Sequence, residues 1–315
     1  MSKIPISRRQ FGALAAGTAL TAAGLVSVET AAATAAVPGP DARVATGASA
    51  PGPDARFATA FEVAGDQGAR TGFGALYGLR DTGELTWNKF DILRADGSTV
   101  WSAPKVIATG WTGLVHLFAD NIAIYTIDAS GALRWHSYSA PSTGDGQWAT
   151  GSGAVIGSGW QTMAKVAYAG SGIFFAVDGA GNLRWWRHTD PSGGAATWAD
   201  GSGRIIDDGW SDLHALAAAG GIIYAAAPSG VLRWYQYTDT WSGQGSFHPN
   251  SGSVIDDDGW QLATSLRAGF TSPWATLRTL DAGSTLRWFR HLDPLEGGSS
   301  WDPRSGAVAA QSWPR

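Results

Sequence analysis

Tryptophan and arginine recur along this chain at matching intervals, and their side chains could bind a ligand. One tryptophan series follows glycine, a second lies in a Pro/Gly-rich loop, and an arginine series directly precedes a third tryptophan. The candidate ligand-binding residues drawn from these series are Trp111, Trp160, Trp210, Trp260, Trp148, Trp198, Trp301, Arg134, Arg184 and Arg233. An indole presents a flat apolar face, and loop atoms and guanidinium groups supply hydrogen-bond donors. A sugar ring requires both, because its C–H faces are apolar and its hydroxyls need fixed partners.

The same residues have a purely structural interpretation. Burying a tryptophan removes roughly 200 Å² from water, on the order of 5 kcal/mol gross, so these rings could simply fill the space between sheets. We favour packing for the tryptophan of Leu-Arg-Trp and leave the other two series open between packing and ligand contact. For the arginines we favour stacking across sheets or pairing with acids over ligand contact. Those acids are Asp207, Asp208, Asp256, Asp257 and Asp258, whose spacing does not match a calcium loop.

Internal repetition is the main structural signal. The tryptophan of Leu-Arg-Trp recurs at Trp135, Trp185, Trp234 and Trp288, with Trp87 as a diverged first copy, at steps of 48 to 54 residues. The Gly-Trp series keeps the same phase and closes with a degenerate Ser-Trp at Trp313. Periods of this size are typical of stacked or radially arranged units. Five copies therefore predict five equivalent modules.

Each unit contains short strands separated by turns. In the third unit we expect strands over 161–169, 172–177, 183–188 and 203–206, with a hairpin turn at Asp178-Gly179-Ala180-Gly181. Four strands in each of five units, without helical periodicity, predict an all-β fold, a five-bladed β-propeller with four antiparallel strands per blade. A β-sandwich is the alternative, but it gives no reason for aromatic residues at fixed phase. The segment 57–64 resembles the strand that follows each Gly-Trp, so we expect it to complete the first blade and bring both ends together.

The N-terminal region differs from the repeats. Residues 1–36 carry Lys3, Arg8 and Arg9 before an apolar run and a small-residue cleavage site, and Ser7-Arg8-Arg9-Gln10-Phe11 resembles a twin-arginine export signal. A membrane-anchored signal helix is the alternative. Residues 37–56 read as a Pro/Gly/Ala linker and 57–315 as the propeller. We therefore expect a secreted protein with no membrane contact after cleavage.

Composition narrows the functional classes. The chain has no cysteine, as suits a protein that folds before export. Its formal charge is −4, and removing residues 1–36 takes away three positive charges and one negative, which leaves −6. Such a charge argues against binding the phosphate backbone of nucleic acid.

Taken together, the motifs resemble a known family. Gly-x-Leu-Arg-Trp, an aromatic or His, a Pro/Gly loop ending in Trp, and Gly-Ser-Gly-x-x-Ile-x-x-Gly-Trp are similar to the repeat of the tachylectin family of five-bladed propeller lectins. The resemblance implies N-acetylglucosamine or N-acetylgalactosamine bound in shallow pockets between blades, and no catalysis. Where the family repeat carries Asp-Asn before the loop tryptophan, this chain has Gly146-Gln147, Ala196-Thr197 and Ser299-Ser300, so the sugar can differ. The first unit, with Thr86 in place of arginine, leaves four good sites at most.

An enzyme is the weaker alternative. His188 and His291 align with Tyr138, Tyr237 and Phe90, so this position calls for an aromatic ring that packs. A glycosidase needs two carboxylates close together, whereas the strands after Gly-Trp offer only Glu62 and Asp212, from non-adjacent units. We therefore expect a multivalent lectin, a monomer without cofactor or metal. A protein-binding scaffold or inhibitor remains the second hypothesis and a glycoside hydrolase the third.

Overall fold

A computed structural model of the chain describes residues 57–62, 72–92, 100–271 and 273–314. The chain divides into the units Met1–Val37 and Pro38–Arg315, and all described residues belong to the second. The predicted export signal and linker, residues 1–36 and 37–56, therefore lie outside the described residues.

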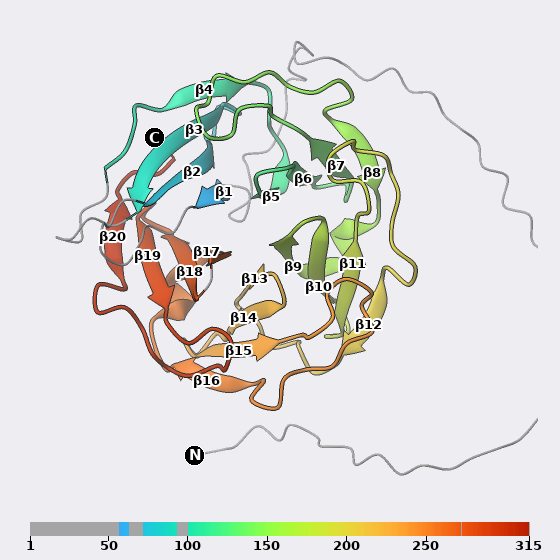
Figure 1. Cartoon of the computed structure of the whole chain (residues 1–315), viewed down its shortest axis with the longest axis vertical. Helices are drawn as coiled ribbons and strands as arrows, with labels where there is room; N and C mark the ends of the chain where they lie inside the picture. Colours follow the sequence, from blue (N-terminus) through green and yellow to red (C-terminus); the bar gives the residue numbers. More distant parts are fainter. Residues whose placement is uncertain (1–56, 63–71, 93–99, 272, 315) are drawn as a thin grey trace, which may run out of the picture. The chain divides into compact units, whose positions relative to one another are not determined.

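The described residues form five four-stranded antiparallel sheets, which surround a common centre in Figure 1 and confirm the predicted five-bladed propeller. Blade 1 comprises β1 (Phe57–Glu62), β2 (Gly72–Leu79), β3 (Leu85–Ile92) and β4 (Lys105–Ala108). Blade 2 comprises β5 (Leu114–Ala119), β6 (Ile124–Asp128), β7 (Leu133–His136) and β8 (Ala154–Gly157). Blade 3 comprises β9 (Met163–Gly170), β10 (Ile173–Asp178), β11 (Leu183–Arg187) and β12 (Arg204–Asp207). Blade 4 comprises β13 (Ala215–Ala219), β14 (Ile222–Ala226), β15 (Leu232–Gln236) and β16 (Ser253–Asp256). Blade 5 comprises β17 (Ala263–Thr271), β18 (Trp274–Asp281), β19 (Leu286–His291) and β20 (Ala307–Ala310).

The order of strands within a blade follows the sequence, from the centre of the ring to its rim. The first strands meet at the centre, where β13 contacts β9 and β17, and β1 contacts β5 and β17. Space there is limited, and the sequence of β13 is Ala-Leu-Ala-Ala-Ala, all buried. The last strands, β4, β8, β12, β16 and β20, lie at the rim (Figure 1). The predicted strands of the third unit correspond to β9–β12, and their boundaries shift by at most two residues.

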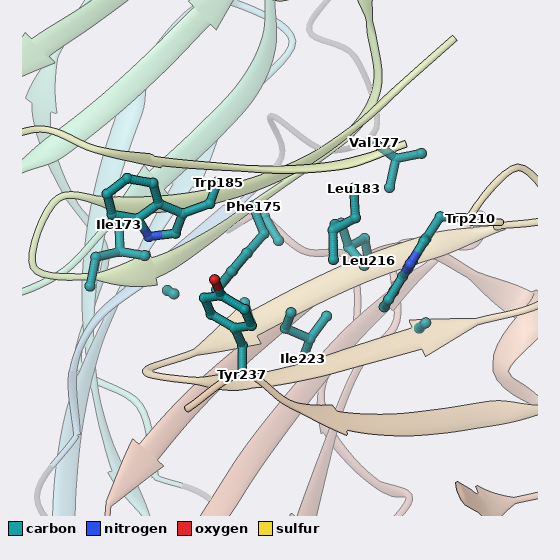
Figure 2. Packing of buried hydrophobic residues seen from close by; sticks show 13 residues of the cluster. Ile173, Phe175, Val177, Leu183, Trp185, Trp210, Leu216, Ile223 and Tyr237 are labelled. Carbon is teal, nitrogen blue, oxygen red and sulfur yellow. The ribbon is translucent and has the colours of Figure 1, made fainter. Parts of the chain in front are cut away.

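The hydrophobic core is divided among the five interfaces between neighbouring blades. Alternation along a strand sends side chains to both faces of each sheet. On β11, Leu183 and Trp185 belong to the core shared with blade 4, whereas Trp186 on the opposite face packs into the core shared with blade 2. Figure 2 shows the blade 3–4 core, with Phe175 and Trp185 of blade 3 facing Ile223 and Tyr237 of blade 4. Each blade therefore depends on both neighbours for burial.

The loop of the following blade fixes Trp87, Trp135, Trp185 and Trp234. The indole N–H of Trp135 donates to Pro191 O at 2.8 Å, and that of Trp185 donates to Thr240 O at 2.8 Å. Three residues after each acceptor, a glycine lies flat against the same ring. A Cβ on Gly194 would come within 2.2 Å of Trp135, so a close approach of backbone to indole requires glycine there. These rings are buried, which agrees with the packing role favoured from the sequence.

Ring closure follows the sequence prediction. Strand β1 pairs with β2 as the innermost strand of blade 1, from Phe57 opposite Gly78 to Glu62 opposite Gly74. Blade 5 ends at the rim strand β20, and the chain then returns to blade 1. There the Trp313 ring packs 5.2 Å from that of Trp101, and Trp101 Nε1 donates to Ala309 O at 2.7 Å. Packing and hydrogen bonds between the first and last blades thus close the ring.

Candidate functional site

The Gly-Trp tryptophans connect one blade to the next. Each follows a rim strand, and its backbone N–H donates to the tight turn between the second and third strands of the same blade, as from Trp210 to Gly181 O at 2.9 Å. Its ring then packs on the following blade. Trp160 lies 4.9 Å from Trp186 and 6.3 Å from Trp198, both of blade 3.

This arrangement repeats as a three-ring set, here called an interblade cluster. Each set contains the Gly-Trp tryptophan, the residue directly after Leu-Arg-Trp, and the loop aromatic. The sets are Trp111, His136 and Trp148 between blades 1 and 2, Trp160, Trp186 and Trp198 between 2 and 3, Trp210, Tyr235 and Phe247 between 3 and 4, and Trp260, Phe289 and Trp301 between 4 and 5. The second ring of each set was not among the candidate residues predicted from the sequence. Its position directly after the Leu-Arg-Trp tryptophan is the signal that could have identified it.

The loop tryptophans use their polar atom within the fold. Trp148, Trp198 and Trp301 donate their indole N–H to carbonyls on the rim strand of the preceding blade, namely those of Ile107, Ile156 and Ile255, at 2.9 to 3.0 Å. Their rings are half-buried, so an edge of each stays accessible. Any ligand contact by this series would be through the ring and not through the N–H group.

The Gly-Trp tryptophans show the opposite pattern. Trp160, Trp210 and Trp260 are only 6%, 5% and 3% exposed, and Trp111 is half-buried. Trp210 Nε1 donates to Asp207 Oδ2 at 2.9 Å. The indole N–H groups of Trp111, Trp160 and Trp260 make no hydrogen bond to the described residues. Their nitrogens nevertheless keep some contact with solvent. These rings mainly pack, and three of them present a donor that no described residue uses.

The arginines face the same interfaces as the clusters. Arg184 and Trp186 are two residues apart on β11 and so share the face that packs toward blade 2. Arg134, Arg184 and Arg233 each donate from Nη1 to a glycine carbonyl of their own blade, at 3.0, 2.7 and 2.8 Å. All three remain partly exposed.

The acids that pair with these arginines differ from those expected. Arg184 Nε lies 2.8 Å from Asp178 Oδ2, and Arg134 Nε lies 3.7 Å from Asp128 Oδ2. Both acids come from the hairpin turn before the arginine and not from the runs that include Asp207, because that turn brings the carboxylate beside the guanidinium. Hydrogen bonds from Asn182 and then from Arg184 hold the pKa of Asp178 well below its usual range. Blade 4 has Ala227 at this position, so its turn offers Arg233 no carboxylate.

An exposed β-branched residue lies beside each arginine. Across the strand pair, Arg184 is opposite Ile205, Arg134 is opposite Val155, and Arg233 is opposite Val254. These side chains are exposed although they are apolar. They put apolar surface next to guanidinium donors at the mouth of each interface, and sequence reasoning did not select them.

The histidines expected to pack are buried in the core. His188 Nε2 donates to Ala195 O at 2.7 Å, and its Nδ1 accepts from the Tyr125 hydroxyl of blade 2 at 2.9 Å. His291 repeats this with Gly298 O and Tyr224. Burial lowers the pKa of both rings. Burial, and then the nearby Arg134, lower the pKa of His136 to about 3.

Within the described residues, no three His, Cys, Asp or Glu side chains lie together in a way that could hold a metal ion. The same residues include no helix that is long and apolar enough to span a bilayer.

The fold and the repeated clusters define a five-bladed propeller with an equivalent group of aromatic rings at four of its interfaces. The Tachylectin family model matches residues 69–247, more than half of the chain, and the chain belongs to this family of lectins. No curated relative matches the chain.

Solved structures similar to the chain include two lectins and a third protein, AofleA. A lectin from Burkholderia pseudomallei is 16% identical over 81% of this chain and 70% of its own, with a TM-score of 0.38. An arginine-to-alanine variant of AofleA from Arthrobotrys oligospora is 11% identical over 82% and 87%, with a TM-score of 0.47. The six-bladed Aleuria aurantia lectin is 11% identical over 82% and 98%, with a TM-score of 0.39.

Proposed function

We propose that this protein is a secreted multivalent lectin that binds N-acetylated hexosamines at the interblade clusters. The observation that carries the proposal is the unused indole donor of Trp111, Trp160 and Trp260, which recurs beside a half-buried loop tryptophan. Membership of a lectin family supports glycan binding as the general activity.

The chemistry of the clusters suits an acetamido sugar. The acetamido group has a methyl that favours apolar surroundings and a carbonyl that accepts a hydrogen bond. An indole N–H at the mouth of the interface can supply that bond, and the exposed Val155 or Ile205 can cover apolar ligand surface. Further donors come from the guanidinium groups of Arg134, Arg184 and Arg233, which can donate to a hydroxyl oxygen of the sugar ring.

Multivalency would compensate for weak individual sites. A shallow site with a Kd of about 1 mM corresponds to roughly −4 kcal/mol. Several such sites on one rigid ring can bind a clustered glycan surface with an avidity that exceeds each affinity by orders of magnitude. Cell-wall or cell-surface glycans outside the producing cell would be the targets, reached through the export signal proposed from residues 1–36. We propose a monomer, since one ring already carries several sites.

Titration calorimetry with N-acetylglucosamine and N-acetylgalactosamine, together with retention on chitin, tests the proposal. We expect more than one site per chain. The triple variant W111F/W160F/W260F keeps the rings but removes the open donors, and should weaken binding at each affected site about fivefold. Its chitin retention should fall by a larger factor, because avidity multiplies the single-site losses.

A matched control uses Trp198, whose N–H is already bonded to Ile156 O. W198F should change stability more than sugar affinity. No binding of either sugar, with no retention on chitin, would overturn the proposed ligand class. Retention on a glycan array of other sugars would keep the lectin activity and replace the sugar.

A further inference from the structure

Trp241 lies outside the repeat pattern and is exposed. Trp241, in the loop between β15 and β16, is 61% exposed, the most exposed aromatic residue in the described part of the chain. Blades 2 and 3 have Ser142 and Ser192 at the same loop position, and blade 5 has Leu295. Neither packing nor the repeat explains such a residue, because an exposed indole leaves a large apolar surface in water.

The loop holds Trp241 in a fixed place. Asp239 Oδ1 accepts the backbone N–H of Trp241 at 3.0 Å and that of Ser242 at 2.9 Å. Thr240 and Gly243, on either side of Trp241 and Ser242, both contact Trp185 of blade 3. Thr240 O accepts the Trp185 N–H, and Gly243 lies against the Trp185 ring. Trp241 is thus preorganised, which reduces the entropic cost of binding.

One face of the indole is supported and the other is free. The guanidinium of Arg187, from β11 of blade 3, lies 4.1 Å from the centroid of the Trp241 ring. This is a cation–π contact that orients the ring. No aromatic ring of the described residues contacts Trp241. The terminal nitrogens of Arg187 make no hydrogen bond to those residues. The pair therefore offers one flat apolar face to solvent, and the guanidinium supports the indole from its other face.

This surface lies on the face of the ring opposite the Gly-Trp residues. Trp210 is bonded to the turn between β10 and β11, whereas Trp241 belongs to a connection between third and fourth strands. Antiparallel order places these two kinds of connection at opposite ends of the blades. A ligand on Trp241 would therefore lie at the other end of the blades from one that contacts a Gly-Trp indole N–H.

We infer that Trp241 is a separate platform on which the apolar face of a pyranose ring stacks, while Arg187 supports the indole from its other face. The ligand class is a polysaccharide chain with accessible pyranose faces. Each molecule then carries one such platform at the end of the blades opposite the Gly-Trp residues.

NMR of the full chain tests this inference, with the Trp241 indole signal assigned from W241F. The probes are soluble oligomers of β-linked glucose and of N-acetylglucosamine. We expect at least one oligomer to shift the Trp241 signal, and W241A to weaken its binding about five- to tenfold. R187A should weaken it about threefold through loss of support for the ring. L295A, at the equivalent exposed loop position, is the matched control and should bind like the wild type.

The interblade variant W111F/W160F/W260F separates this platform from the proposed cluster sites. It should keep the Trp241 shift. If no oligomer shifts the Trp241 signal, or if W241A binds as tightly as L295A, the platform is refuted while the cluster sites can still stand. If W241A alone loses binding and the triple variant keeps all of it, the platform stands without the clusters. Denaturant unfolding of each variant confirms that the fold is intact.

Discussion

The interface between blades 2 and 3 and the closing interface between blades 5 and 1 serve the same purpose with different residues. In the first, the Tyr125 hydroxyl bonds to His188, the Trp135 N–H bonds to Pro191 O, and Trp186 completes a three-ring cluster. At the closing interface, Arg278 replaces Tyr125, and its guanidinium lies 4.5 Å from the Phe90 centroid. Burial, and then the nearby Arg290, lower the pKa of Arg278 to about 9.

Polar atoms without partners concentrate at the closing interface. Asn88 takes the place of Trp186 and is fully buried, with no hydrogen bond from either side-chain atom within the described residues. The indole N–H groups of Trp288 and Trp313 are likewise buried without a described partner. Each such group costs free energy of desolvation that no bond to a described residue offsets. At the internal interfaces the repeated residues supply hydrogen-bond partners for buried polar atoms. At the closing interface several such partners are missing from the described residues, so we expect it to be the least stable interface of the ring.

The largest expected effect comes from removing the strand that closes the ring. Deleting residues 57–62 removes β1 and leaves the edge of β2 unpaired. We expect loss of the folded monomer and aggregation, measured by size-exclusion chromatography and circular dichroism. Deletion of residues 1–56 is the control and should leave a folded monomer. A folded monomer without residues 57–62 would show that β1 is dispensable for closure.

Acid should weaken the internal interfaces. The pKa of His136 in the folded chain is about 3, below the ordinary 6.5, so the unfolded chain takes up the proton first. The stabilisation by neutral His136 is complete above pH 6.5 and is lost as the pH falls from 6.5 toward 3, by about 1.4 kcal/mol per pH unit. The lowered pKa values of His188 and His291 add to the same trend.

Unfolding free energies between pH 7 and pH 4 measure this effect. H136F introduces the ring that blade 5 carries at Phe289, and it should flatten the pH dependence by one histidine. The reciprocal F289H should steepen it. Identical pH profiles for all three proteins would mean that these rings do not titrate on unfolding.

The sequence predicted the topology well because each marker occupies one structural position in every blade. Periodicity located the strands, the turn at Asp178–Gly181 and the closing role of β1. It could not decide how far a ring is covered, because tryptophan serves equally in packing and in binding. Burial of Trp160 depends on how neighbouring blades meet, and the bond from Trp210 to Asp207, three residues earlier, depends on the local path of the chain. Trp241 was missed because a search for repeats does not detect a residue that occurs once.

A smaller effect separates a satisfied indole from an unsatisfied one. W185F removes the N–H bond to Thr240 O and leaves that carbonyl without its donor, in addition to the loss of ring volume. W288F loses similar volume but no described hydrogen bond. We expect W185F to cost about 1 kcal/mol more than W288F, measured by urea unfolding. Equal losses would contradict the contrast between the two interfaces.

The smallest effect is a gain obtained by repairing the closing interface. Asn88 and Thr86 share one face of β3 and are both fully buried, but Thr86 Oγ1 donates to Gly78 O at 3.0 Å whereas the Asn88 amide has no described partner. N88V removes the unpaired amide and keeps a β-branched residue suited to a strand, so it should raise the unfolding free energy by about 1 kcal/mol. T86V removes a hydroxyl that donates a hydrogen bond in the buried interface, so the same measurement should show a loss of about 1 kcal/mol. A loss in both variants would mean that the Asn88 amide contributes a stabilising interaction, and that the closing interface is as well satisfied as the internal ones.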